Sequence, residues 1–133
     1  MFWSPNSMVI APMSLKSTLL MILLVFMMTG GQVLFKVAAN SMEMPQRFSL
    51  VEFVKVLFHP PLFFAIFLYG AASIFWVYIL RDTDLSKAYP FVAITLFLVP
   101  LCGVLFLKEA FSWPLLLGGG VILVGVSIIA FHA

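Results

Sequence analysis

Charged residues are scarce in this chain of 133 residues, where seven Lys or Arg and five Asp or Glu make up 9% of the sequence. A soluble domain carries about 25% charged residues and about 45–50% apolar ones, whereas hydrophobic residues reach 64% here. The composition therefore excludes a water-soluble fold and a disordered tail. The net charge of +2 is small and scattered, so we expect no nucleic-acid partner.

Cysteine is nearly absent as well, and the chain contains no catalytic motif. The single Cys102 excludes a disulfide framework within the chain and a Cys-based zinc site. His59 and His132 stand at the ends of apolar stretches, not opposite metal-ligating residues. The phosphate-binding P-loop, the nucleophile elbow and paired carboxylates are all missing. We expect neither an enzyme nor an ATP-driven pump, and no metal or other cofactor.

The few charges divide the chain into four long uncharged stretches, at residues 17–35, 60–80, 88–107 and 110–131. Each has about the 20 residues that an α-helix needs to cross a bilayer core about 30 Å thick. The stretches are apolar on every side and lack the alternation of a membrane β-barrel strand. We predict an all-α integral membrane protein. A tail at residues 1–16 would precede one domain, residues 17–133, with four transmembrane helices at about 17–39, 60–80, 88–107 and 114–131.

The first stretch has one alternative, a cleaved signal peptide with Lys16 as its basic region. Its apolar run exceeds the roughly 7–15 residues of a signal, so we expect a membrane helix. Residues 48–59 alternate apolar and charged positions at helical spacing, which indicates either a short amphipathic helix in the membrane interface or an extension of the second span. The short polar turns at 81–87 and 108–113 predict antiparallel neighbouring helices.

Positive charge gives almost no preference for one orientation in the membrane. If the helices alternate in direction, one side of the membrane has Lys16, Arg81 and Lys87. The other side has Arg47, Lys55 and Lys108, and also Lys36 if its side chain reaches that surface. Lys and Arg favour the cytoplasmic side. The near balance permits insertion in both orientations as well as a weakly biased single one.

Polar residues of the first span are candidates for a substrate site because polar groups in a membrane are costly. Gln32, Lys36 and Asn40 recur every four residues and share one helical face, and Thr29 lies one turn earlier. One interpretation is a groove for a phosphate-bearing headgroup, with Lys36 reaching headgroup depth. The other is a boundary lysine with a glutamine that bonds to a neighbouring helix.

Proline and glycine mark the third and fourth spans. Pro90 and Pro100 each remove a helical hydrogen bond, which indicates either a hinged, cavity-lining helix or plain packing. Gly118 and Gly125 are seven residues apart on one face of the fourth span, where small residues permit close approach of another helix. We predict that they form a dimer seam, with packing inside the protomer as the alternative.

Three motifs resemble the small multidrug resistance (SMR) family of the drug/metabolite transporter superfamily. They are Gly30-Gly31-Gln32-Val33-Leu34-Phe35-Lys36, then Leu85-Ser86-Lys87-Ala88-Tyr89-Pro90-Phe91, and Leu107-Lys108-Glu109 before the glycine-rich last span. In that family, exporters of cationic drugs carry a membrane-embedded glutamate two turns before the lysine. Met28 stands at that position here, so proton-coupled export of cations is not what the resemblance implies.

The pattern Gly31-Gln32-x-x-x-Lys36 with Ala88-Tyr89-Pro90 is most similar to another branch, the small subunits of flippases for 4-amino-4-deoxy-L-arabinose-phosphoundecaprenol. The resemblance implies a dimer in the bacterial inner membrane that moves a polyprenyl-phosphate-linked sugar or a similar anionic lipid by alternating access. Lys36 would contact phosphate. Gln32 and Tyr89 would bind the headgroup with Thr29 beside them, and Arg81 would guard one mouth.

Two other functions stay open at this point. The chain could export small solutes such as polyamines, or it could be a non-transporting membrane scaffold subunit of a glycolipid pathway. Its partner is equally open, because both a homodimer and a heterodimer with a related four-span subunit fit the pattern.

Overall fold

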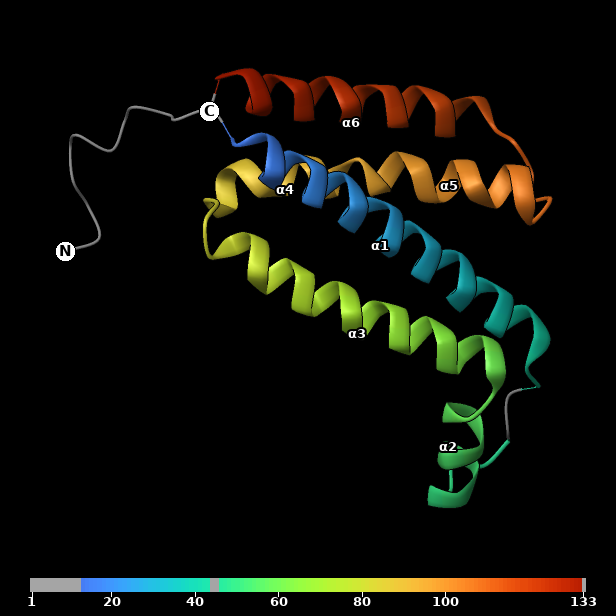
Figure 1. Ribbon diagram of the computed structural model, residues 1–133. Coiled ribbons are helices and arrows are strands. Elements are labelled where there is room, and N and C mark those ends of the chain that lie inside the picture. Colours follow the sequence, from blue (N-terminus) through green and yellow to red (C-terminus); the bar gives the residue numbers. More distant parts are fainter. Residues whose placement is uncertain (1–12, 44–45, 133) are drawn as a thin grey trace.

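The structure is a computed structural model that describes residues 13–43 and 46–132. Within these ranges the chain is helical and contains no strand, which confirms the prediction of an all-α protein. Its elements are α1 (Leu15–Ser41), α2 (Leu50–Leu57), α3 (Pro60–Leu80), α4 (Leu85–Ala93), α5 (Thr95–Phe106) and α6 (Trp113–His132). Figure 1 shows the long helices lying side by side, with α1 between α3 and the α4–α5 pair and α6 on the outer side of that pair.

Three helical stretches are long and apolar enough to cross a membrane: α1, α3, and α4 together with α5 (Leu85–Phe106). They correspond to the first three predicted spans. The described apolar part of α6, Trp113–Ile129, is shorter than a full span. The fourth span therefore stays a prediction, while the multi-pass helical architecture is present.

The buried core is small and lies mainly between α1 and α3. Met21 and Leu24 of α1 pack with Ala72 and Ile79 of α3 and with Ala88 of α4. Met21 and Leu24 are the largest fully buried side chains in the described part of the chain, while most large apolar side chains are exposed. In water such a surface would aggregate. Facing lipid it is stable, because membrane helices associate through close packing and small residues rather than through apolar burial.

The third span is interrupted at Ile94, between its two prolines. Pro90 lies inside α4 and Pro100 inside α5, so neither predicted hinge residue is itself the break. At the interruption the Ile94 N–H donates to the Phe91 carbonyl three residues back, at 3.1 Å. The Thr95 hydroxyl donates to the Val92 carbonyl at 2.6 Å. Each proline removes one backbone bond, so this tightened turn lies between two weakened points of the helix.

Helix α2 is a separate element rather than an extension of α3. The Ser49 hydroxyl accepts a hydrogen bond from the Glu52 N–H at 3.2 Å and caps its start. Pro60 and Pro61 begin the next helix, where proline is favoured. Apolar residues of α2 are exposed, Leu50 by 80%. A position in the membrane interface would cover them, and that position stays a prediction.

The charged residues gather at the two ends of the helices. Lys16 lies at the start of α1 and near the α3–α4 turn, where its Nζ donates to the Tyr78 hydroxyl at 3.3 Å. The C-terminal end of α1, the start of α3 and the α5–α6 connection all lie at the other end, where α2 adjoins the start of α3 (Figure 1). The predicted antiparallel arrangement of neighbouring helices is confirmed.

Candidate functional site

One face of α1 carries three side chains on successive turns: Met28, Gln32 and Lys36. Met28 lines a hollow of about 150 Å³ between α1, α3 and α4, together with Tyr69, Ala72, Ser73, Trp76, Tyr89 and Val92. One turn further on, the Gln32 side-chain amide donates to the Tyr69 hydroxyl at 2.6 Å. The face therefore runs from an aromatic hollow, past an amide–phenol contact, to a charged end.

The ring of Tyr69 packs directly against Gly31, in the motif Gly30-Gly31-Gln32. A Cβ atom added to the buried Gly31 would overlap the Tyr69 ring. The ring also contacts Phe35 of α1, with centroids 5.4 Å apart. Gly31 thus permits the close approach of α3 to α1 that brings the phenol to Gln32, as small residues do in membrane helix pairs.

The Gln32–Tyr69 contact gives a first testable prediction. In a double-mutant cycle of Gln32→Leu with Tyr69→Phe, we expect a coupling of about 0.6–1.5 kcal/mol, the range for hydrogen bonds between membrane helices and in proteins generally. Thermal unfolding of the protein in nanodiscs measures it. Asn40→Leu combined with Tyr69→Phe is the control, since Asn40 lies two turns beyond Gln32, and its coupling should be near zero. A Gln32–Tyr69 coupling no larger than the control contradicts the contact.

Tyr89 reaches the same hollow from α4. Its ring packs edge-on against Trp76 of α3, with centroids 5.8 Å apart, and its side chain is 58% exposed. An exposed phenol on a rigid aromatic contact has an apolar body and a polar tip. The structure therefore brings Tyr89 of α4 into one hollow with Met28 of α1.

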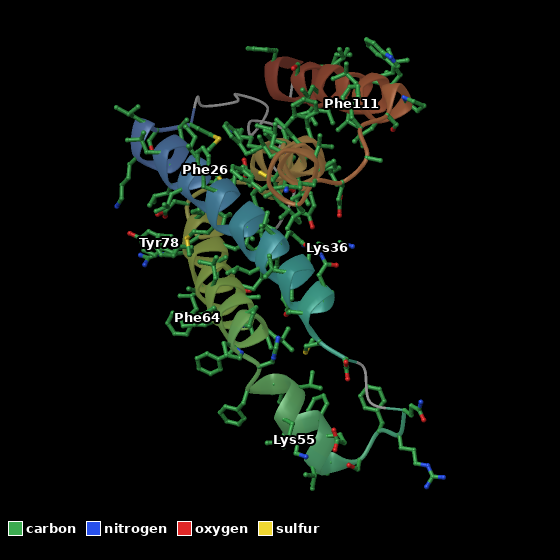
Figure 2. The ribbon with its side chains drawn as sticks, turned by 90° about the vertical axis from the view of Figure 1, so that its right-hand side faces the viewer. Phe26, Lys36, Lys55, Phe64, Tyr78 and Phe111 are labelled. Atoms are coloured by element: carbon green, nitrogen blue, oxygen red, sulfur yellow. The ribbon has the colours of Figure 1, made fainter. Side chains whose placement is uncertain are left out.

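Lys36 forms an ion pair with Glu109, which lies in the connection between α5 and α6. The Lys36 Nζ and a Glu109 carboxylate oxygen are 3.7 Å apart, and the side chains are 50% and 44% exposed. Figure 2 shows Lys36 near the C-terminal end of α1, beside this connection. The lysine is therefore available at the edge of the helices and has one anionic neighbour.

The other two predicted substrate residues are not brought to this site. Thr29 is 6% exposed, and its hydroxyl has no hydrogen-bond partner within the described residues, so it is inaccessible in this conformation. Arg81 is exposed at the C-terminal end of α3, the opposite end from Lys36. Near that end lies a pocket of about 530 Å³ with a mixed polar and apolar lining, which includes Lys16, Tyr78, Asp82, Asp84 and Lys87.

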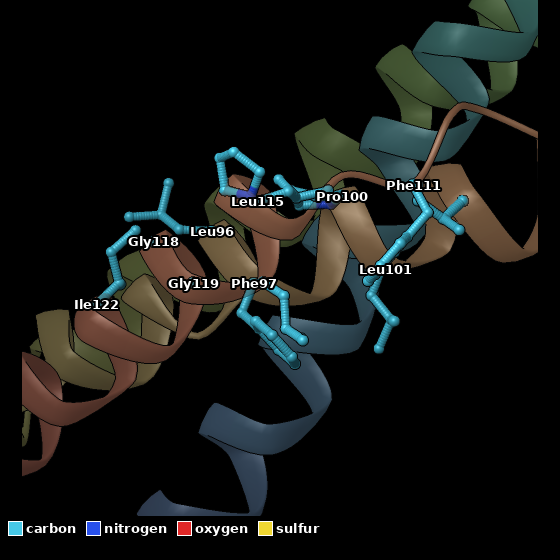
Figure 3. Close-up of a pocket in the computed structure, with 12 residues that line it drawn as sticks. Leu96, Phe97, Pro100, Leu101, Phe111, Leu115, Gly118, Gly119 and Ile122 are labelled. Carbon is cyan, nitrogen blue, oxygen red and sulfur yellow. The ribbon is translucent and has the colours of Figure 1, made fainter.

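Helix α6 meets α5 along an apolar groove of about 220 Å³ (Figure 3). Gly119 approaches Phe97 so closely that a Cβ atom there would lie 2.7 Å from its ring. Gly118 and Gly125 are different, because a Cβ atom at either would meet nothing within 4 Å. Close packing inside the protomer therefore uses Gly119, while the two predicted seam glycines lie open.

Residues of this site that were absent from the predicted set include Tyr69, Trp76 and Glu109. Tyr69 and Trp76 are seven residues apart and therefore share a face of α3. This spacing of aromatic residues in the sequence could have identified both as candidates. Glu109 belongs to the end of the molecule where helix alternation already placed Lys36 and Lys108. No group of three His, Cys, Asp or Glu that could hold a metal occurs within residues 13–43 and 46–132.

Long apolar helices around a small buried core are the architecture of a multi-pass membrane protein. The chain belongs to the EamA-like transporter family, whose family model matches residues 1–131. The resemblance of Gly31-Gln32-x-x-x-Lys36 and Ala88-Tyr89-Pro90 to the small subunits of flippases for 4-amino-4-deoxy-L-arabinose-phosphoundecaprenol is confirmed by this family and by curated relatives. No solved structure matches the chain.

Curated relatives carry flippase names. The chain is 34% identical over 111 residues to the "Probable 4-amino-4-deoxy-L-arabinose-phosphoundecaprenol flippase subunit ArnE" of Aeromonas salmonicida (strain A449), covering 84% of this chain and 94% of that protein. It is 37% identical over 112 residues to the protein of that name from Aeromonas hydrophila subsp. hydrophila, covering 84% and 95%. A probable subunit ArnF of the same flippase type, from Erwinia tasmaniensis, is 29% identical over 116 residues, covering 82% and 90%.

Proposed function

We propose that this chain is a subunit of a flippase in the bacterial inner membrane. Its substrate would be a polyprenyl-phosphate-linked sugar of the aminoarabinose type, or a similar anionic lipid. The observation that carries the proposal is Lys36 at the charged end of the face that also bears Gln32. The names of the relatives support the same substrate class.

The sign of the charge along this face favours an anionic ligand. A bare charge inside hydrocarbon costs several kcal/mol or more, so a phosphate that crosses needs a cationic or hydrogen-bonding neighbour. Lys36 supplies the charge, and Gln32, Tyr69 and Tyr89 supply amide and phenol groups. Met28 occupies the register where a cation exporter would carry a carboxylate, and it lines the hollow. The prenyl tail would stay in lipid.

Transport by alternating access requires the site to widen. The hollow of about 150 Å³ is smaller than the roughly 300–1,000 Å³ of a typical ligand pocket. Helix α4, which carries Tyr89, is separated from α5 by the interruption at Ile94. We propose that α4 moves against α5 about this turn, with the weakened backbone at Pro90 and Pro100 on either side as the hinge.

The open glycine face of α6 is the proposed dimer seam, with either a second copy or a related subunit as the partner. We expect Gly125→Leu and Gly118→Leu to shift the protein from dimer to monomer in nanodiscs, because each leucine side chain would prevent a helix of the partner from packing closely against α6. Gly119→Leu is the contrast, since it collides with Phe97 inside the protomer and lowers the melting temperature. A dimer that survives both Gly118→Leu and Gly125→Leu would place the seam elsewhere.

Ligand binding distinguishes the proposed function from its two alternatives. Mass spectrometry of lipids that purify with the protein should show a polyprenyl phosphate sugar, and phosphate lipids should raise the melting temperature while soluble polyamines do not. Stabilisation by polyamines alone would favour a small-solute exporter. A bound lipid that never changes leaflet would favour a scaffold subunit.

A further inference from the structure

The ion pair between Lys36 and Glu109 joins segments that are far apart in the sequence. Lys36 lies in the last turns of α1, and Glu109 lies beyond the end of α5. The chain has five Asp or Glu, and Glu109 is the one whose carboxylate lies beside the proposed phosphate site. A carboxylate beside an anion site repels phosphate and weakens its binding. Its presence there is explained if it binds a cationic group of the same ligand.

The backbone holds Glu109 in this position independently of the ion pair. Lys108 has a φ of 55°, in the left-handed region that a residue with a side chain seldom adopts. The Glu109 N–H donates to the Gly103 carbonyl at 3.1 Å. The carboxylate lies over Gly103, where an added Cβ atom would be 2.5 Å from one oxygen. Such strained backbone persists where the surroundings fix it, and it is frequent at ligand sites.

Both members of the pair keep bonding capacity for a ligand. The 3.7 Å separation is longer than the roughly 2.7–2.9 Å of a strong charge-assisted hydrogen bond. An ammonium has three donors and a carboxylate about four acceptor positions. An exposed pair of this kind adds little to the stability of a protein, so a ligand that offers both charges can replace it.

We propose that Glu109 is a specificity residue that binds the amine of the substrate headgroup while Lys36 binds its phosphate. This inference rests on the proposed function and assigns recognition of the ammonium group of an aminoarabinose-type headgroup to one residue, Glu109. On binding, Lys36 exchanges Glu109 for the phosphate of the lipid, and Glu109 exchanges Lys36 for its ammonium group. A lipid with a neutral sugar would leave Glu109 unpaired beside the phosphate, and this repulsion would exclude it.

The test compares two lipids that differ only in the amine. Vesicles contain the protein, as the oligomer in which it purifies, and either an aminosugar polyprenyl phosphate or its N-formyl derivative, which has no positive charge. For the wild type we expect transfer between leaflets to be about 10-fold faster with the amine, the size of one charge-assisted bond. Glu109→Gln should reduce this preference to about 2-fold or less by slowing transfer of the amino lipid.

A second variant separates the position of the carboxylate from its charge. Gly103→Ala adds a methyl group that displaces the Glu109 carboxylate without changing any charge, and we expect it to lower the preference for the amine as well. Gly70→Ala is the matched control, because a Cβ atom there meets nothing within 4 Å, and it should behave as the wild type. Glu109→Asp, which keeps the charge, should retain part of the preference. Melting temperatures verify that each variant is folded.

The possible results are distinct. Equal transfer of both lipids by the wild type, or an unchanged preference in folded Glu109→Gln, overturns the role of Glu109 and leaves the proposed flippase function standing. Transfer of neither lipid overturns both.

Discussion

Lys36→Ala is expected to slow transfer of a polyprenyl phosphate lipid between leaflets by at least about 10-fold, since it removes a charge-assisted bond to the phosphate. The variant leaves Glu109 without its cationic partner at the same site, so the remaining charge there repels the headgroup. Fluorescent or mass-tagged lipid in vesicles that contain the purified protein measures the transfer. The melting temperature should change little, because the exposed ion pair stabilises the fold by about 1 kcal/mol or less.

Two variants show whether this loss is specific. Lys36→Arg keeps the charge and should retain part of the transfer. Lys55→Ala removes an exposed lysine of α2 that is paired with Glu52 at 3.5 Å, and transfer should be unchanged. Normal transfer by folded Lys36→Ala would contradict the assignment of the phosphate to this residue.

Gly31→Ala is expected to destabilise the contact between α1 and α3 by about 1–3 kcal/mol, the usual effect of an added group in a close-packed site. The new methyl group would collide with the Tyr69 ring, which must then move away from Gln32 and Phe35. We expect a lower melting temperature in detergent and loss of the Gln32–Tyr69 coupling.

The neighbouring glycine provides the control for this prediction. A Cβ atom on Gly30 would lie 3.5 Å from a methyl group of Leu68, an ordinary contact. Gly30→Ala should therefore be neutral or slightly stabilising, because alanine is the better helix former by up to about 1 kcal/mol. Equal melting temperatures for the two variants would show that Gly31 is not a packing residue.

Helix positions followed closely from the sequence where polar residues and prolines bound the apolar stretches. The predicted span 60–80 and helix α3 have the same bounds, because Pro60 begins the helix and Arg81 follows its last apolar residue. Helix α1 continues to Ser41, two residues past the predicted end. Pro90 and Pro100 indicated a hinged third span as one of two interpretations, but the sequence did not place the interruption at Ile94, because it depends on a local change of hydrogen bonding between the two prolines.

The candidate site was predictable on one helix and not across helices. Period-four spacing placed Gln32 and Lys36 on one face of α1, and the structure has them there. Their partners lie at sequence separations that helical periodicity does not reach. Tyr69 meets Gln32 because Gly31 allows α3 to approach, and Glu109 meets Lys36 because the backbone turns back at Lys108. Thr29 was predicted as a substrate residue because it is polar and lies in a span, but its hydroxyl is buried in the structure.

The central claim is that this chain takes part in moving a phosphate-bearing polyprenyl lipid across a membrane. The most direct measurement reconstitutes the wild-type oligomer into vesicles with the lipid in one leaflet and follows its appearance in the other, beside an analogue whose phosphate is replaced by an uncharged link. The account predicts that the phosphate lipid crosses at a rate well above that of protein-free vesicles, and that the analogue does not. Equal movement of both lipids, or no movement of the phosphate lipid above the protein-free rate, would contradict it.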